Sequence, residues 1–317
     1  MAVLGRALFA ALVGGTLVCS CGTDTQAEDA VASGDVAGRV DIGDGHHLYL
    51  DCRGTGSPTV VLQSGFGNAG DIWSLSESAS PAVQPALATS TRVCSYDRPG
   101  SLVTTTVRDG EVVDAEEPSP GRSDEVPMPR DPAEVVAELH DLLTAAGESG
   151  PYVLVGHSLG GPLQVLYAAT YPSEVAGIVL VDAPMPELRA SVTADQWNLM
   201  AHPQLTPGSY PGGYTAETYS LDQLMDEIEA APPLPPVPMV VLVRGEDTPL
   251  PDPLPPGMSA ADLEALHSAE PQAQAEFAAS QPDAELVVVP GTTHYIQTQR
   301  PDAVVDAVNR VRDRADG

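Results

Sequence analysis

The chain alternates between short apolar runs and stretches in which apolar residues recur at helical spacing. Runs such as Thr59–Gln63 and Tyr152–Gly156 have the length and composition of strands that are buried on both faces. The clearest helical pattern covers 132–146, where Asp131 can cap the first turn and Pro132 can occupy it. Strands separated by helices of this length predict an α/β fold, with a mostly parallel sheet covered by helices on both faces.

The other predicted elements continue the same alternation of strands and helices. Strands are expected at 39–42, 47–52, 92–96, 177–181, 239–243 and 285–289, and helices at 159–170, 260–278 and 301–314. Two stretches interrupt this alternation. Residues 101–130 are interpreted as an inserted hairpin that turns at Asp109-Gly110, and residues 185–237, with a helix expected at 216–230, as a cap insertion.

The first residues have the composition of an export signal. Arg6 supplies a positive charge, and the apolar run that follows it at 7–18 is too short to span a bilayer. The run ends in Val-Cys-Ser-Cys, which resembles a bacterial lipobox in which Cys21 would be lipidated. We therefore expect residues 1–21 to be a signal peptide and the protein to be exported, either anchored to the cell membrane through a lipid or freely secreted.

Residues 22–37 are small and polar without any period, which predicts a flexible tether ahead of a folded domain over 38–317. Export implies an oxidising compartment. That compartment bears on Cys52 and Cys94, which both fall inside predicted strands. These two cysteines are either buried free thiols or the partners in a disulfide.

Charge and composition narrow the classes of function. The 317 residues include 44 acidic and 14 basic side chains, a net charge of -30, so we expect no nucleic-acid partner. All the basic residues are Arg, and the absence of Lys excludes Schiff-base chemistry and the Walker lysine. No clustered Cys and His spacing predicts a metal, and no glycine-rich loop predicts a phosphate ligand, so we expect neither a metal nor a cofactor.

The chemistry concentrates in Gly-His-Ser-Leu-Gly at 156–160, between a predicted strand and a predicted helix. In this context G-x-S-x-G is a strong signal for a nucleophilic serine. Gly156 and Gly160 allow the sharp turn that would project the Ser158 hydroxyl from the sheet edge. The helix that follows would aim free N–H groups and its positive dipole end at the same point, where they would stabilise an oxyanion.

A serine hydroxyl needs a base to remove its proton. Among the seven histidines, His294 is the candidate because it follows a late apolar strand, in Gly-Thr-Thr-His at 291–294. It would therefore lie on a loop at the carboxyl end of that strand. The other six fall on different elements: His46, His47, His140, His157, His202 and His267.

At this point the sequence resembles the α/β-hydrolase superfamily, in particular its secreted bacterial esterase-like branch. The resemblance rests on the serine turn at 156–161 and on three further motifs in the family's order, at 62–67, 96–100 and 291–294. It implies a Ser, acid, His triad and an oxyanion hole formed by the amides of Leu159 and Phe66. The family's sheet order also puts the second strand beside the fourth, which would bring Cys52 and Cys94 onto neighbouring strands.

The resemblance leaves the triad acid open between two loops. The family usually takes it from the loop after the strand that follows the cap, where Asp247 stands two residues after Gly245. Some relatives instead use an acid after the preceding strand, the place of Asp182. The acid must hold the imidazole tautomer and stabilise its positive charge, which an acid on either loop could do. We favour Asp247, with Asp182 as the alternative and Glu246 as a third choice.

These expectations combine into a cofactor-independent serine hydrolase that cleaves a small-molecule carboxylic ester. The same triad also serves peptidases, lactonases and cofactor-free haloperoxidases, and fold similarity does not separate them. A second hypothesis is a non-catalytic, lipid-anchored surface binding protein on this scaffold, whose membrane contact would be the lipid alone. Structural roles are expected for Trp73 in the core, for His157 within the turn, and for Asp97 and Arg98 as an ion pair.

Overall fold

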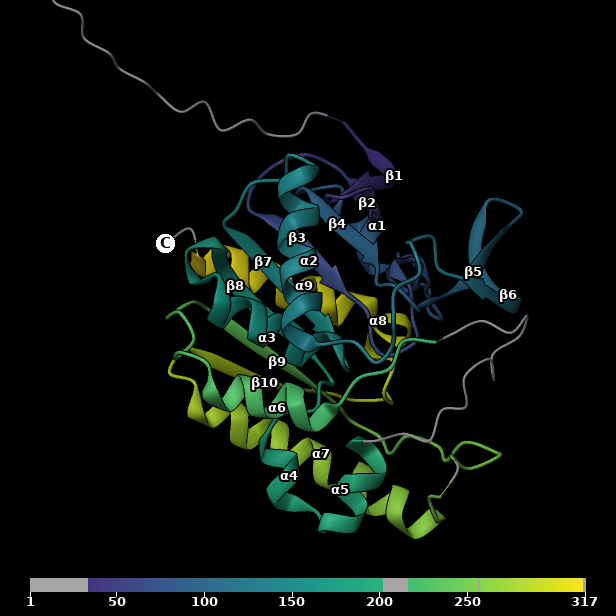
Figure 1. Ribbon diagram of the computed structural model, residues 1–317, viewed down its shortest axis with the longest axis vertical. Coiled ribbons are helices and arrows are strands. Elements are labelled where there is room, and N and C mark those ends of the chain that lie inside the picture. The colour runs from purple at the N-terminus through teal and green to yellow at the C-terminus, as the bar shows by residue number, and fades with distance from the viewer. Residues whose placement is uncertain (1–33, 202–215, 256, 316–317) are drawn as a thin grey trace, which may run out of the picture.

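The computed structural model describes residues 34–201, 216–255 and 257–315 (Figure 1). In this part of the chain one large sheet has the order β1-β2-β4-β3-β7-β8-β9-β10. Its strands are β1 (Val36–Asp41), β2 (His47–Arg53), β3 (Thr59–Gln63), β4 (Val93–Asp97), β7 (Tyr152–His157), β8 (Val175–Val181), β9 (Met239–Arg244) and β10 (Ala284–Val289). From β4 to β10 every neighbouring pair is parallel, while β1 and β2 are joined antiparallel at one edge. The predicted mostly parallel sheet is confirmed.

Helices cover both faces of this sheet (Figure 1). One apolar cluster packs the sheet against α2 (Pro132–Ala145), α3 (Gly160–Thr170) and α7 (Ala260–Ser280). A second cluster packs the opposite face against α1 (Val83–Leu87), α8 (Ile296–Gln299) and α9 (Pro301–Ala315), and it includes the fully buried Trp73 of a 3-10 helix at 70–74. The central strands read as continuous apolar runs because they are buried on both sides.

Two excursions leave the sheet where the sequence predicts them. The first is a hairpin of β5 (Leu102–Arg108) and β6 (Glu111–Pro120), which projects from the body of the molecule in Figure 1. The second contains α4 (Glu187–Ser191), α5 (Ala194–Ala201) and α6 (Leu221–Ala230). The expected cap helix from Ala216 is wrong over its first turn, since Ser220 caps a helix that begins at Leu221 and residues before it run as non-helical chain against the body.

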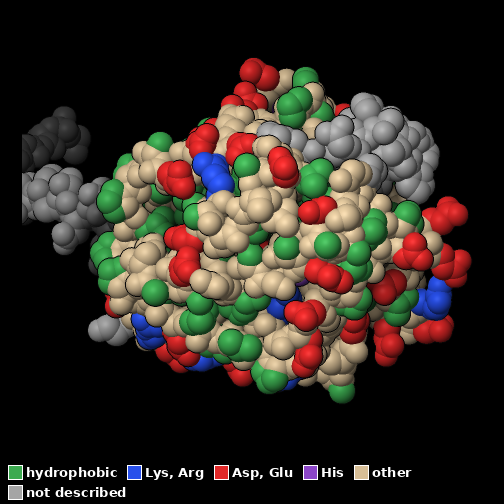
Figure 2. All heavy atoms as spheres, turned by 90° about the horizontal axis from the view of Figure 1, so that it is seen from below, with side chains coloured by type: hydrophobic (Ala, Val, Ile, Leu, Met, Phe, Trp, Pro, Cys, Tyr) green, Lys and Arg blue, Asp and Glu red, His purple; other side chains and the backbone are tan. Residues whose placement is uncertain are grey.

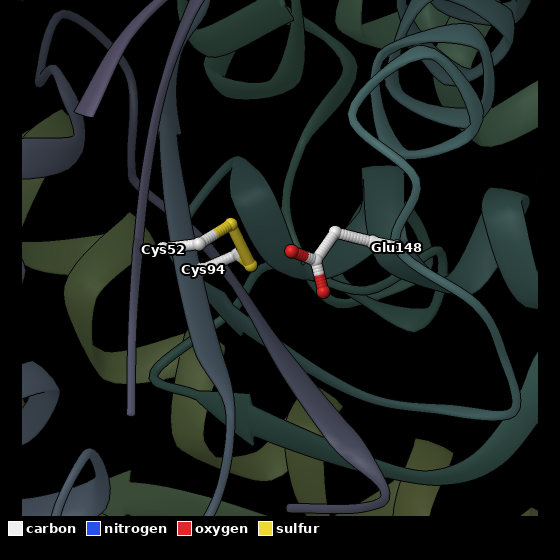
Figure 3. A group of neighbouring side chains, drawn as sticks. All are labelled: Cys52, Cys94 and Glu148. Atoms are coloured by element: carbon white, nitrogen blue, oxygen red, sulfur yellow. A yellow bond between two sulfur atoms is a disulfide. The ribbon is translucent and has the colours of Figure 1, made fainter. Parts of the chain in front are cut away.

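A disulfide joins β2 and β4 near the amino ends of the parallel strands. Cys52 on β2 lies directly across from Cys94 on β4, and their sulfurs form a disulfide (Figure 3). Glu148 lies beside this disulfide and binds Arg92, whose side chain is 1% exposed, at 2.7 Å. Because the sulfurs are bonded to each other and the carboxylate is bonded to Arg92, this cluster offers a metal no thiolate ligand. Of the two alternatives for the cysteines, the structure has the disulfide.

The predicted signal peptide, including Cys21, lies outside the described residues. The predicted tether overlaps the fold slightly, because β1 begins at Val36, ahead of the expected domain start at 38. Among the described residues no helix is both long and apolar enough to cross a membrane. Acidic side chains are spread over the face of the molecule in Figure 2, where basic ones are few.

Candidate active site

Ser158 stands on a sharp turn between β7 and α3. Its φ is +49°, a left-handed conformation that a side chain rarely adopts, so the surrounding structure must hold it. A Cβ on Gly156 would lie 2.4 Å from the Gly160 carbonyl oxygen, and one on Gly160 would lie 2.3 Å from that of Gln63. The two glycines are therefore required by close backbone contact, as the sequence pattern predicts.

A cavity of about 230 Å³ opens beside the serine. Apart from Ser158 its lining is apolar or aromatic: Phe66, Leu159, Pro184, Met200, Ala201, Tyr219 and Leu221. Residues from the cap excursion and from the loop after β3 thus meet the nucleophile turn around one space. Such a cavity suits a hydrocarbon group placed next to the serine hydroxyl.

The two residues whose amides are expected to form an oxyanion hole both line this cavity. Phe66 comes from the loop after β3 and Leu159 from the residue preceding α3, and the backbone amide of neither has an acceptor among the described residues. The loop can approach the turn because residue 65 is glycine, since a Cβ there would lie 3.0 Å from the Ser158 Cβ. Unpaired donors at a helix start and on an adjoining loop can bind an anion.

His294 lies at the same edge of the sheet, and its partner is Asp182. The ring Nδ1–H donates to Asp182 Oδ2 at 2.7 Å, which leaves Nε2 as the basic nitrogen. The preference for Asp247 is therefore wrong, as is the third choice Glu246, because both side chains are exposed on the loop after β9 and the alternative acid holds the imidazole.

The position of Asp182 explains why this residue, and not Asp247, is the partner of His294. It follows β8 directly with φ +43°, its side chain is fully buried, and the amide of Ser158 donates to the carbonyl of the preceding residue, Val181. This bond ties the nucleophile turn to the strand end that carries the acid. Asp247 instead lines a separate groove between β9, β10 and α7.

Asp182 is kept ionised by more than the histidine. Arg244 Nη1 donates to Oδ2 at 2.8 Å, and Gln274 Nε2 donates to Oδ1 at 3.2 Å. Burial alone would raise the pKa of this carboxyl, but the hydrogen bond from His294 and the charge of Arg244 together lower it to about 2. A carboxylate that stays charged can orient the imidazole and stabilise the imidazolium that forms during catalysis.

His157 has the structural role expected of it. Its Nε2 donates to the backbone carbonyl of His294 at 2.9 Å, and burial, aided by the nearby His294 ring, lowers its pKa to about 3. A neutral, buried His157 therefore supports the loop that carries His294. Among the described residues there is no hydrogen bond between the Ser158 hydroxyl and the His294 ring. In ligand-free enzymes such bonds commonly form only with substrate in place.

The expected ion pair between Asp97 and Arg98 is wrong. Asp97 binds Arg122 at 2.7 Å, and Arg98 binds Glu217 at 2.8 Å. Consecutive residues at a strand end point to opposite sides, so the two side chains take different partners. Sequence reasoning also missed Arg244 and Glu217, since no local spacing links either residue to the motifs it contacts.

Comparisons with known proteins agree with this architecture. A model of the alpha/beta hydrolase family matches residues 60–307. The fold is similar to a thermophilic esterase from Thermogutta terrifontis, with a TM-score of 0.55 and 20% identity over 89% of this chain and 98% of that one. It is equally similar to an alpha/beta hydrolase fold protein from Burkholderia ambifaria, with a TM-score of 0.55 and 20% identity over 86% and 97% of the two chains.

A shorter match joins the chain to an uncharacterized protein of Schizosaccharomyces pombe. The two are 40% identical over 101 residues, which make up 32% of this chain and 15% of the yeast protein. The family model, in contrast, spans most of the chain and contains the serine turn, the acid and the histidine. The chain therefore belongs to the alpha/beta hydrolase family.

Proposed function

We propose that the protein is a serine hydrolase that cleaves carboxylic esters, with Ser158 as nucleophile, His294 as general base and Asp182 as the acid of the triad. The observation that carries the proposal is the hydrogen bond from His294 to the buried Asp182, at the sheet edge where Ser158 borders an apolar cavity. Acyl transfer needs a buried carboxylate that fixes an imidazole tautomer, at the same sheet edge as a strained serine.

The chemistry follows from these positions. As Ser158 Oγ attacks the ester carbonyl carbon, His294 Nε2 takes its proton, and the carbonyl oxygen becomes an oxyanion that the Phe66 and Leu159 amides bind. His294 then returns the proton to the leaving alkoxide, and the alcohol departs from an acyl-enzyme. Water, deprotonated by the same nitrogen, attacks that acyl group and releases the acid and free Ser158.

The apolar cavity favours a neutral ester with a hydrocarbon acyl group. Its lining residues in the described part of the chain offer no charged side chain to a substrate, and the acidic surface repels anions. Two structural neighbours carry names of this class, an esterase and a protein described as degrading N-acyl homoserine lactone, the latter with a TM-score of 0.51 and 17% identity. Hydrolysis of p-nitrophenyl esters of graded acyl length measures this preference.

Labelling with a fluorophosphonate probe tests the nucleophile. The wild-type chain should be labelled, and Ser158→Ala should not, whereas Ser173→Ala, which changes an exposed serine after α3, should be labelled like the wild type. The binding-protein hypothesis would replace this proposal if correctly folded wild-type chain took no label and hydrolysed none of the esters. Labelling that survives in Ser158→Ala would assign the nucleophile elsewhere.

We also propose that the enzyme works outside the cytoplasm. The Cys52–Cys94 disulfide supports this, because such bonds persist mainly in oxidising compartments. Together with the lipobox-like segment it favours an exported protein held at the membrane through Cys21. Expression of the full chain with Cys21→Ala distinguishes the two routes, since a lipoprotein would move from the membrane fraction to the medium and a secreted protein would not change its fraction.

A further inference from the structure

Arg98 lies wholly inside the protein, directly behind the loop that carries Phe66. Its side chain is 1% exposed, and each of its three nitrogens has a partner. Two are backbone oxygens of that loop, since Nη1 donates to Ser64 and Nη2 to Gly65, both at 2.7 Å. Glu217 accepts from Nε at 2.9 Å and from Nη2 at 2.8 Å, and the Tyr219 hydroxyl oxygen also accepts from Nε at 3.2 Å.

The Gly65 carbonyl accepts from Arg98 Nη2 and, at 3.2 Å, from the Asn68 amide, and its direction determines where the Phe66 amide points. The Gly65 C=O and the Phe66 N–H belong to one planar trans peptide, so they point in opposite directions. Because Arg98 holds the oxygen on its own side, the N–H is directed away from Arg98. This is the amide that has no acceptor among the described residues and whose residue borders the cavity beside Ser158.

The next peptide of the loop is held from the same side. The Gly67 amide donates to Glu217 Oε1 at 2.5 Å, so Arg98 and Glu217 together bind the peptide groups before and after Phe66. Glu217 is itself fully buried. Burial alone would lower the pKa of Arg98, but the Glu217 carboxylate raises it, so the guanidinium stays charged.

Glu217 comes from the cap excursion, ahead of α6, and not from the sheet. Its own amide donates to the Gly100 carbonyl at 2.9 Å, and two residues later the Tyr219 hydroxyl donates to Glu217 Oε2 at 2.7 Å. The Tyr219 side chain also lines the cavity. One carboxylate therefore connects the wall of the substrate cavity to the loop behind the expected oxyanion donor.

We propose that Arg98 and Glu217 are positioning residues that aim the Phe66 amide at the developing oxyanion and make this aim depend on the cap segment just ahead of α6. The proposal rests on the proposed hydrolase function. Neither side chain reaches the reacting atoms, and both act through the backbone of residues 64–67. Their loss should therefore slow the chemical step more than it weakens substrate binding, because only the transition state carries the oxyanion.

A second buried arginine provides a matched control. Arg92 binds Glu148 through Nε and Nη2, and its Nη1 donates to the backbone oxygens of Gly34 and Gly54. Arg92 and Arg98 thus have the same burial and the same kinds of partner, but Arg92 lies at the other end of the strands. A substitution of either residue costs comparable packing and electrostatics, and only Arg98 adjoins the site.

The test compares Arg98→Lys with Arg92→Lys in ester hydrolysis. Lysine keeps the charge but lacks the fork that binds several acceptors at once. We expect both variants to lose thermal stability, and Arg98→Lys alone to lose about 10- to 100-fold in kcat with KM nearly unchanged, the cost of a misplaced catalytic donor. Glu217→Gln and Glu148→Gln repeat the comparison with a milder change should Arg98→Lys fail to fold.

Amide hydrogen exchange in the peptide that contains residues 64–68 supplies a measurement independent of turnover. Exchange there should quicken in Arg98→Lys and Glu217→Gln relative to the Arg92 and Glu148 variants. Equal kcat in the two arginine variants, or equal exchange in that peptide, would overturn the positioning role and leave both pairs purely structural. If the wild-type chain hydrolysed no ester, the proposed function would fail, and the exchange comparison would still decide whether Arg98 and Glu217 order this loop.

Discussion

Two buried arginine–carboxylate pairs occupy opposite ends of the parallel strands and differ in what they hold. At the amino ends, Arg92 pairs with Glu148 and donates to the backbone oxygens of Gly34 and Gly54. Glu148 lies beside the disulfide (Figure 3). At the carboxyl ends, Arg98 and Glu217 bind the loop that carries Phe66. The chemistry of the pairs is the same, so their different roles come from which backbone accepts the remaining donors.

The difference teaches that a buried charge is best interpreted through its backbone partners. Burying an ion pair carries a desolvation cost that its own attraction only partly offsets, so stability alone is a weak explanation for either pair. Around the amino ends, the ion pair fixes the backbone at one edge of the sheet. Around the carboxyl ends, the ion pair orients the peptide groups of a loop beside the cavity.

The largest effect is expected at the carboxyl ends, from Asp182, the proposed acid of the triad. Asp182→Asn should lower kcat by about 10⁴-fold, because the imidazole loses the carboxylate that holds its tautomer and stabilises its charge. Steady-state ester hydrolysis measures it, with Asp247→Asn as the matched control that should keep wild-type turnover. A loss in Asp247→Asn and none in Asp182→Asn would reverse the assignment of the acid.

The amino ends should respond in stability and not in turnover. Replacing the disulfide by Cys52→Ser with Cys94→Ser removes a crosslink over a sequence separation of 42, which should cost about 4 kcal/mol of unfolding free energy by the chain-entropy relation. Urea unfolding measures that loss, and kcat below the unfolding range should remain that of the wild type. A fall in kcat of the folded variant would show that the two ends are not independent.

A smaller effect concerns the pH dependence of stability. The hydrogen bond from His294 and the charge of Arg244 lower the pKa of Asp182 from its ordinary value of 3.8 to about 2, so the ionised carboxylate favours the folded state. That contribution, roughly 2 kcal/mol, is complete above about pH 4 and is lost as the pH falls toward 2. Urea unfolding of the wild type and Asp182→Asn should therefore show a stability difference that shrinks between pH 4 and pH 2. A difference that stays constant over this interval would contradict the low pKa.

Most of the fold was predictable because it depends on local patterns. The buried strands read as apolar runs, Asp131 and Pro132 mark the start of α2, and Asp109-Gly110 marks a hairpin turn. The misplaced start of the cap helix has a tertiary cause. Ala216 to Tyr219 suit a helix by propensity, but Glu217 is instead drawn to Arg98, and such a contact overrides a weak local preference.

The candidate site was predictable as far as it rests on motifs that fold locally. Ser158 and His294 each follow a strand in a recognisable sequence, and the structure brings their loops to one edge. The acid was not predictable in the same way, because two strand ends offer an aspartate and only the packing of Arg244 and Gln274 around one of them decides. Partners such as Glu217, 119 positions from Arg98, leave no trace in local spacing.

Because Glu217 belongs to the cap excursion, exchanging the whole cap for that of another protein would also remove the partner of Arg98. A chimera that grafts a foreign cap over the whole of 185–237 would discard the carboxylate and leave the Arg98 guanidinium buried without a counter-charge from Glu217. A graft that ends before residue 217 would keep Glu217 and would change only the part of the cavity wall that Met200 and Ala201 form. Libraries that seek new substrate ranges should therefore vary the excursion only ahead of residue 217 and leave Glu217 and Tyr219 unchanged.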